Sequence, residues 1–194
     1  MEKQIIISIS REYGSGGHEI GRKLAEKLSL PFYDRNLLDE LANNNKINMK
    51  DLLENDEKSD GFFFGKDRAS SVSQTVAELQ FGLLKQKARK GNSFVVIGRC
   101  SDELFDSMKN VNVLKVFICA DWDEKVNRVI QKRSMDKNLA EKTILKHDKN
   151  RITYHDNFCV HRWGDARSYD LSVNSSRLGL DGTVNFIYDY VRSF

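Results

Sequence analysis

The chain has 194 residues, of which 40% are hydrophobic and 30% are charged, and its formal net charge is +3. This length is enough for one well-buried domain and short for two large ones, and the composition is that of an ordinary soluble globule. The small net charge argues against a nucleic-acid-binding protein, and no apolar run reaches the ~20 residues of a membrane span.

Predicted strands and helices alternate along the chain. In chain order we expect a strand over 4–10, a helix over 18–29, a strand over 31–34, helices over 35–44, 46–59 and 71–89, a strand over 93–97, a helix over 101–108, a strand over 111–119, helices over 121–133 and 138–154, a strand over 169–173 and a helix over 183–191. The helices follow from apolar residues at helical spacing, and the strands are short apolar runs. Such alternation indicates a parallel sheet covered on both faces. We predict a three-layer α/β/α fold with a parallel five-stranded sheet, in a single domain over residues 1–194.

A glycine-rich turn joins the first predicted strand to the first predicted helix. Backbone N–H groups in such a turn, together with the positive end of the helix, form a cradle for an anion. The order of strand, loop and helix therefore predicts a phosphate site. Its members are Gly14, Ser15, Gly16, Gly17 and His18. The alternative is a tight turn that binds nothing.

Polar residues follow several of the predicted strands. They are 11–17 after the first strand, Asp34 and Arg35 after the second, Gly98 and Arg99 after the third, and Asn174 and Ser175 after the last. Ligands of parallel α/β sheets bind beyond the carboxyl ends of the strands, so these groups are expected to meet in one crevice. Asp34 there is interpreted as a ribose, base or metal contact, or simply as the end of a strand.

One long helical stretch is strongly basic. Its cations are Arg128, Lys132, Arg133, Lys137, Lys142, Lys146, Lys149 and Arg151. One interpretation is a solvated helix face, and the other is a mobile arm that closes over phosphates. Asp148 and Arg151, three residues apart, also suit a simple helical ion pair.

Aromatic residues and cysteines are less informative. Phe62–Phe64 lie in a glycine-flanked loop and suggest either partner binding or base stacking, and Trp163 either stacks on a base or fills the core. Cys100, Cys119 and Cys159 have no metal-ligand spacing and fit reduced thiols. With no secretory signal at the start of the chain, we expect a cytoplasmic protein.

Four segments resemble the nucleoside monophosphate kinases, specifically the cytidylate kinases and cytidylate kinase-like proteins of the P-loop superfamily. Gly14-Ser15-Gly16 followed by Ile20–Ala25 resembles their phosphate loop and its helix, and Phe32-Tyr33-Asp34 resembles the entry to their monophosphate-binding region. Val96–Arg99 is similar to the strand end that contacts the acceptor nucleotide, and Tyr169–Ser176 to the closing strand. The resemblance covers nearly the whole chain.

The resemblance implies a function and an assignment of roles. The reaction would be transfer of the ATP γ-phosphate to a nucleoside monophosphate, CMP or dCMP first, with Mg²⁺. A monophosphate-binding insertion would span about 35–90 and a lid-like helical region about 128–168. Asp34, Arg35 and Arg99 would hold the acceptor, and Arg128, Arg133 and Arg151 would close over the transferring group. No nucleic acid or membrane partner is expected, and the sequence does not decide the oligomeric state.

The phosphate loop departs from the family at three positions. Gly17 stands where the lysine belongs, Glu19 where the magnesium-side hydroxyl belongs, and Arg11 where the first glycine belongs. Phosphoryl transfer needs positive charge and positioning, so Arg11 is predicted to replace the lysine. Its alternative is a surface ion pair with Glu12 or Glu19. Ser15 and Glu19 are the candidate metal ligands.

Two other functions compete with the kinase. A dinucleotide-dependent oxidoreductase would use Asp34, about 20 residues after Gly14, as its ribose-binding acid. Against it, Glu19 stands where the third glycine of G-x-G-x-x-G belongs. A non-catalytic nucleotide sensor, or pseudokinase, is favoured by the absent lysine and the aromatic loop.

Overall fold

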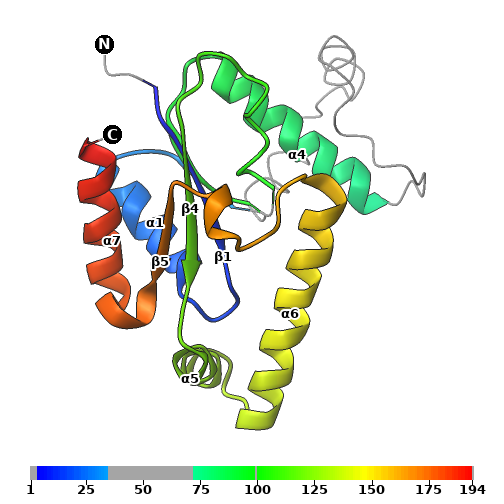
Figure 1. Cartoon of the computed structure of the whole chain (residues 1–194), viewed down its shortest axis with the longest axis vertical. Coiled ribbons are helices and arrows are strands. Elements are labelled where there is room, and N and C mark those ends of the chain that lie inside the picture. The colour runs from blue at the N-terminus through cyan, green and yellow to red at the C-terminus, as the bar shows by residue number, and fades with distance from the viewer. Residues whose placement is uncertain (1–3, 35–71, 99, 194) are drawn as a thin grey trace.

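The computed structural model describes residues 4–34, 72–98 and 100–193 (Figure 1). Its elements are β1 (Ile6–Arg11), α1 (Gly17–Leu28), β2 (Phe32–Tyr33), α4 (Val72–Arg89), β3 (Phe94–Ile97), β4 (Val113–Cys119), α5 (Trp122–Arg133), α6 (Lys137–Phe158), a 3₁₀ turn (Ala166–Ser168), β5 (Leu171–Asn174) and α7 (Ser175–Ser193). The helices predicted over 35–44 and 46–59 and the aromatic loop with Phe62–Phe64 lie outside the described residues.

The five strands form one parallel sheet in the order β2-β3-β1-β4-β5. In its central strand β1, Ile7 lies beside Val95 of β3 and Leu114 of β4. All carboxyl ends therefore lie at one edge, the lower edge in Figure 1, where the loop after β1 also lies. The predicted α/β class and parallel five-stranded sheet are confirmed.

Alternation along β1 divides the core between the two faces of the sheet. Ile7 and Ile9 pack with Ile20 and Leu24 of α1 and with Ile187 of α7. On the other face, Ile6 packs in a cluster that also contains Leu84 and Ala88 of α4, and Leu104 and Phe105. A third cluster joins α5 to α6 through residues such as Val126 and Ile144. Helices thus cover both faces, which makes the three layers that the apolar strands predict.

Two predicted helices differ from the structure. Residues 101–107, expected as a helix, form successive hydrogen-bonded turns. The last helix begins at Ser175 rather than at 183, and it contains a kink at Gly179, whose φ of 65° is left-handed. Gly179 and Gly182 weaken the helical pattern of this segment, which explains why its first turns escape a sequence prediction.

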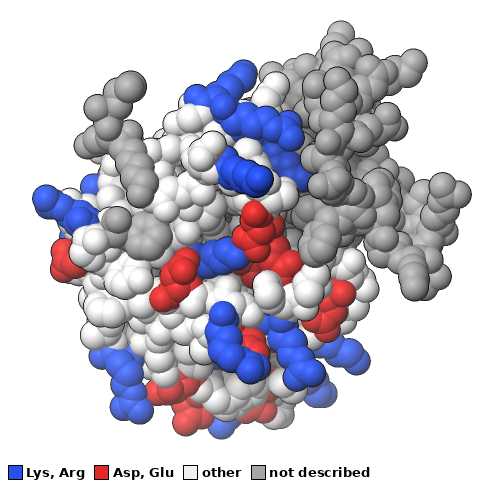
Figure 2. All heavy atoms as spheres, turned by 45° about the horizontal axis from the view of Figure 1, so that its top comes forward, with Lys and Arg blue, Asp and Glu red and all other residues white. Residues whose placement is uncertain are grey.

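Charged side chains are mixed over the surface. On the face in Figure 2, Lys and Arg side chains are interspersed with Asp and Glu side chains. Pairs such as Lys115 with Asp106, at 2.7 Å, illustrate this pattern. Among the residues that the structure describes, no helix is both long and apolar enough to cross a bilayer.

Candidate functional site

The loop between β1 and α1 has the backbone of an anion cradle. Gly14 and Gly16 have φ values of 82° and 78°, in the left-handed region, and Gly16 is the N-cap of α1 with no side-chain cap. Left-handed residues alternating with ordinary ones turn successive N–H groups toward one side. The first N–H groups of α1 also lack intrahelical partners. The loop can therefore bind a phosphate through its main chain.

Ser15 is the structural centre of this loop. Its buried hydroxyl donates to the Glu12 carbonyl at 2.9 Å and accepts from the Gly17 N–H at 3.3 Å. Its carbonyl accepts from the Ser175 hydroxyl at 2.6 Å and from Arg128 Nη1 at 2.9 Å. Ser175, at the start of α7, and Arg128 of α5 thereby anchor the loop from two sides.

Arg11 and Gly17 face each other across the loop. A Cβ at Gly17 would lie 2.6 Å from Arg11 Cβ, closer than real Cβ atoms approach. Arg11 Nη1 points toward the end of β3, where it donates to the Gly98 carbonyl at 3.4 Å. The Arg11 guanidinium therefore lies between the ends of β1 and β3, and its stem occupies the space that a side chain at position 17 would need.

Lys125 of α5 forms a buried ion-pair cluster behind the loop. Its ammonium lies 3.2 Å from Glu12 Oε2 and 3.1 Å from Asp148 Oδ2, and only 5% of Lys125 is exposed. Asp148, on α6, also accepts from the Tyr13 N–H at 2.7 Å. The cluster ties α5 and α6 to the loop and neutralises this lysine.

Arg151 of α6 is a second connection to the loop. Its Nη1 donates to the Arg11 carbonyl at 2.9 Å, and its guanidinium lies 5.5 Å from the centre of the Tyr13 ring. Tyr13 stacks on His147, with ring centres 4.2 Å apart. Burial, followed by the charges of Arg151, Lys146 and Arg133, lowers the pKa of His147 and so favours the neutral ring at this stacked position.

The remaining predicted site residues lie at the margins. His18 Nε2 is 2.8 Å from Asp34 Oδ2, which joins the start of α1 to the end of β2. Glu19 pairs with Lys23 at 3.3 Å. Arg133 is exposed in the last turn of α5. Arg35 and Arg99 lie outside the described residues.

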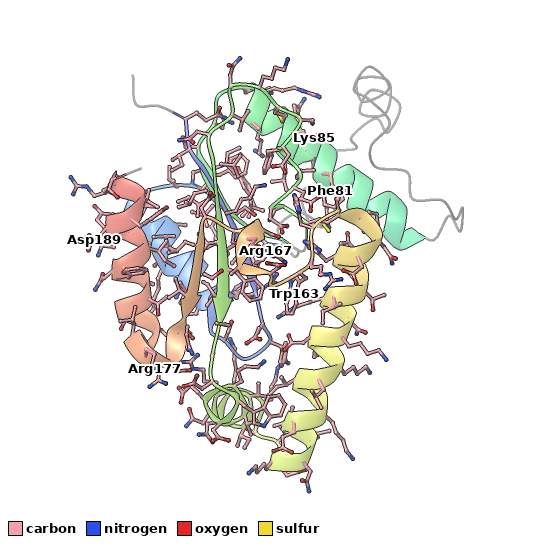
Figure 3. The ribbon with its side chains drawn as sticks, viewed as in Figure 1. Phe81, Lys85, Trp163, Arg167, Arg177 and Asp189 are labelled. Atoms are coloured by element: carbon pink, nitrogen blue, oxygen red, sulfur yellow. The ribbon has the colours of Figure 1, made fainter. Side chains whose placement is uncertain are left out.

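Trp163 lies in the segment between α6 and β5 (Figure 3). It packs edge-to-face on Phe117 of β4, with ring centres 5.2 Å apart. Of the two sequence interpretations, this contact fits the packing role.

The structure thus brings Arg11, Arg128 and Arg151 to one loop. Glu12 and Ser175 belong to the groups that the sequence placed at this edge of the sheet, and the structure adds Lys125 and Asp148, which sequence reasoning did not place at the site. The sequence gives only a weak signal that Lys125 belongs to the site. Its partners Glu12 and Asp148 lie 113 and 23 residues away along the chain. Asp148 was interpreted only as the partner of Arg151, an interaction the structure keeps at 3.6 Å.

Comparisons with known proteins show what the chain is similar to. The model of the cytidylate kinase-like family matches residues 6–177. An uncharacterized protein from Eubacterium ventriosum is 33% identical, with a TM-score of 0.77, over 98% of this chain and 100% of that chain.

More distant structures share the fold. Shikimate kinase from Bacteroides thetaiotaomicron is 14% identical, with a TM-score of 0.53, over 97% of this chain and 98% of that chain. The protein TT1252 from Thermus thermophilus is also 14% identical, with a TM-score of 0.53, over 99% of this chain and 98% of that chain. No curated protein matches the chain.

Proposed function

Because the chain belongs to the cytidylate kinase-like family, we propose that it transfers the γ-phosphate of ATP to a nucleoside monophosphate, with CMP and dCMP as the first candidates. The strand order β2-β3-β1-β4-β5 also differs from the order 3-2-1-4-5 of dinucleotide-binding sheets. A nucleotide kinase therefore suits this chain better than the oxidoreductase.

The close approach of Arg11 to Gly17 is the observation that carries the proposal. Where the family has a glycine and a lysine, this chain has an arginine and a glycine, and the two positions are in steric contact. The exchange keeps one long cationic side chain at the loop, that of Arg11. It also removes the side chain at position 17, with which Arg11 would collide. A guanidinium also binds phosphate oxygens in a bidentate manner.

The reaction assigns a role to each cation. An oxygen of the acceptor monophosphate attacks the γ-phosphorus, the bond to the β–γ bridging oxygen breaks, and ADP leaves with that electron pair. Negative charge spreads over the transferring group, so catalysis depends on positioned positive charge. In the proposal Arg11 supplies it from the loop, Arg128 and Arg151 supply it from α5 and α6, and Asp34 with Arg99 orients the acceptor.

Magnesium use is implied by the family, but the predicted metal ligands do not suit it here. Ser15 Oγ is buried and already bonded to Glu12 O and Gly17 N. The Glu19 carboxylate is turned to Lys23. We therefore assign no magnesium ligand and base the proposed chemistry on the arginines.

A coupled assay for ADP release tests the proposal. Wild type is measured with ATP, Mg²⁺ and each of CMP, dCMP, UMP, AMP and GMP, against a background with ATP alone. We expect turnover with one acceptor, and a kcat for R11A that is lower by about 100-fold or more. The double variant R11G/G17K restores the family's pattern. Its kcat should be at least about tenfold higher than that of R11A.

A matched control is R192A. Arg192 lies in the last turn of α7, far from the loop in sequence, and its guanidinium lies over the Tyr188 ring. It should keep the wild-type kcat. Undiminished turnover in R11A would contradict the role of Arg11. No turnover with any acceptor in folded wild type would contradict the kinase assignment.

A nucleotide sensor is the second candidate. It is favoured because Lys125, a lysine that lies beside the loop, is neutralised by two carboxylates. Binding of ATP by calorimetry without turnover, in wild type and R11A alike, would support the sensor.

A further inference from the structure

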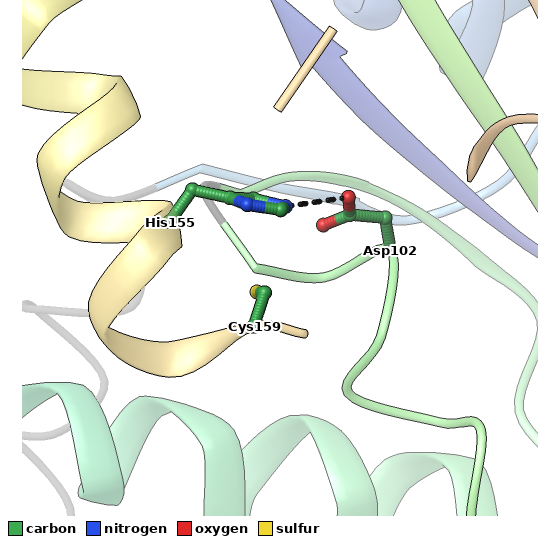
Figure 4. A group of neighbouring side chains, drawn as sticks. All are labelled: Asp102, His155 and Cys159. Atoms are coloured by element: carbon green, nitrogen blue, oxygen red, sulfur yellow. Dashed lines mark hydrogen bonds and ion pairs between the residues drawn. The ribbon is translucent and has the colours of Figure 1, made fainter. Parts of the chain in front are cut away.

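A second polar cluster is buried beside the sheet. It contains Asp102 and Cys100 from the turns after β3, and His155 and Cys159 from the end of α6. Figure 4 shows the Asp102 carboxylate and the His155 ring joined by an ion pair, with the Cys159 side chain below them. Asp102 is 2% exposed, His155 0% and Cys100 1%. The kinase reaction proposed above uses none of these groups.

The cluster contains polar atoms that have no partner. His155 Nε2 lies 3.0 Å from Asp102 Oδ2. The other two atoms of these side chains, Asp102 Oδ1 and His155 Nδ1, are buried and have no hydrogen-bond partner among the described residues. An unpartnered buried oxygen or nitrogen is costly, so its presence points to an unseen ligand.

The local structure holds the four side chains in place. His155 lies in the last turn of α6, and Cys159 is the C-cap residue, whose N–H donates to the His155 carbonyl at 2.7 Å. This bond keeps the two residues one above the other at the end of the helix. The carboxylate of Glu103 accepts from the N–H groups of Val160 and His161, at 2.9 and 2.7 Å. These bonds fasten the turns after β3 to the end of α6 and bring Asp102 to His155.

A thiol nucleophile is one possible use of Cys159, His155 and Asp102, which occur in the order thiol, imidazole and carboxylate. Contact with the Cys100 thiol, and then burial, raise the pKa of Cys159 above its ordinary value. A nucleophilic cysteine needs a lowered pKa and access to substrate. This cluster lacks the lowered pKa, and the acid and the imidazole that would assist the thiol are buried.

We propose that Cys100, Asp102, His155 and Cys159 bind one Zn²⁺ ion as a closed structural site. One potential ligand atom from each of Asp102, His155 and Cys159 lies within 4.8 Å of the others. The Cys100 thiol, which neighbours Cys159, is the fourth donor, and its sulfur is not among the atoms of that 4.8 Å group. Tetrahedral zinc with sulfur, nitrogen and oxygen ligands needs about 3.3–3.8 Å between them, so the three side chains must draw together and Cys100 must turn toward them to complete the site.

Zinc gives the unpartnered Asp102 Oδ1 a partner. The Nε2 atom of His155 binds the ion in place of its present 3.0 Å contact with Asp102 Oδ2, because an ion on Nδ1, across the ring, would be out of reach of the same carboxylate. Asp102 Oδ1 is the remaining ligand. The ion would join the segment after β3 to the end of α6, and it would displace the thiol protons of both cysteines.

Metal content and cysteine protection in the full-length chain test this proposal. The purified protein is stripped with a chelator, dialysed against Zn²⁺ and assayed for bound metal, and Co²⁺ replaces zinc in a parallel absorption measurement. We expect about one ion per chain, thiolate-to-cobalt charge-transfer bands, and a higher Tm with zinc. In wild type, zinc should slow alkylation of Cys100 and Cys159, mapped by mass spectrometry, and leave the rate at Cys119 unchanged.

Variants of the three cysteines complete the design. C100S and C159S should each weaken zinc binding by at least tenfold, whereas C119S, a matched change in β4, should bind like wild type. Folded wild type that retains no zinc would overturn the proposal. So would bound zinc that leaves Cys100 and Cys159 as reactive as before, which would be an adventitious ion only. The wild-type protection experiment decides even if a variant fails to fold, and no arm depends on kinase activity.

Discussion

Position 17 has no room for a side chain. The side chain of Arg11 lies where a Cβ of residue 17 would project, and the 2.6 Å approach excludes any residue larger than glycine without a shift of the loop. The residues at positions 11 and 17 therefore depend on each other. Considered alone in the sequence, each of the two departures looks like the loss of a family residue. In the proposed kinase, they together move a cation from one side of the loop to the other.

Gly14 offers a test of the loop backbone. Its φ is 82°, and an added Cβ would meet the Lys125 carbonyl at 2.9 Å. Gly91 has a similar φ of 77° with nothing within 4 Å of an added Cβ. We expect G91A to cost about 1 kcal/mol from backbone strain alone, and G14A to cost at least about 1 kcal/mol more, because it adds a clash.

Urea denaturation of the two alanine variants measures this difference, and G14A should also weaken ATP binding. Equal destabilisation of G14A and G91A would show that the close approach to Lys125 has no energetic consequence.

At the scale of elements, the α5–α6 pair is connected to the loop by charge as well as by apolar packing. Val126, Val129 and Ile144 form the apolar contact, against which Tyr13 of the loop also packs. Arg128 and Arg151 donate to loop carbonyls, and Asp148 accepts from a loop N–H. The helices of the predicted lid-like region therefore contact the loop between β1 and α1.

Lys125 is the central cation of this connection. Replacing it by methionine leaves the carboxylates of Glu12 and Asp148 facing each other with their shared cation removed. We expect K125M to lose about 2–4 kcal/mol of unfolding free energy, as when one partner of a buried pair is removed. K132M, the same change at an exposed site of α5, should lose less than about 0.5 kcal/mol. Chemical denaturation compares the two, and similar losses would contradict the buried-pair interpretation.

His147 of α6 makes stability depend on pH. Its pKa in the folded chain is below the ordinary value of 6.5, mainly through burial and then through neighbouring cations. As the pH falls through about 6.5, the unfolded chain binds a proton that the folded chain resists. The stabilisation is therefore present above that pH and is lost as the pH falls toward the folded pKa.

The variant H147Q has no such titration. Between about pH 7.5 and about pH 5.5 the unfolding free energy of wild type should fall more than that of H147Q. Added salt should shrink the part of this difference that comes from Arg151, Lys146 and Arg133, and leave the part due to burial. An identical pH dependence in both proteins would contradict this role of His147.

At the scale of the whole molecule, the sheet gathers distant parts of the chain at one edge. The loop after β1, the end of β3, the start of α5 and the start of α7 meet there because all five strands run parallel. The Tyr13–Asp148 bond joins residues 135 apart in sequence, and the Ser15–Ser175 bond joins residues 160 apart. The family match over 6–177 includes all of these segments.

The amino-acid sequence by itself determined the fold class, the five strands, the position of the glycine-rich loop and the family. These follow from local signals, because apolar runs, helical spacing and glycine-rich turns act over a few residues. Two predictions were wrong, namely a helix where residues 101–107 form turns and a start at 183 for the last helix. Both fall where tertiary contacts or glycines outweigh the local helical preference.

Only the tertiary structure decided which side chains meet. Sequence order carries no information about the rotation of α5 and α6 that brings Lys125 to Glu12 and Asp148. The same is true of the contact between Arg11 and Gly17, and of the approach of Cys100 and Asp102 to His155. Strand order and helix packing set these distances, and both arise from burial of apolar surface over the whole chain rather than from any local pattern.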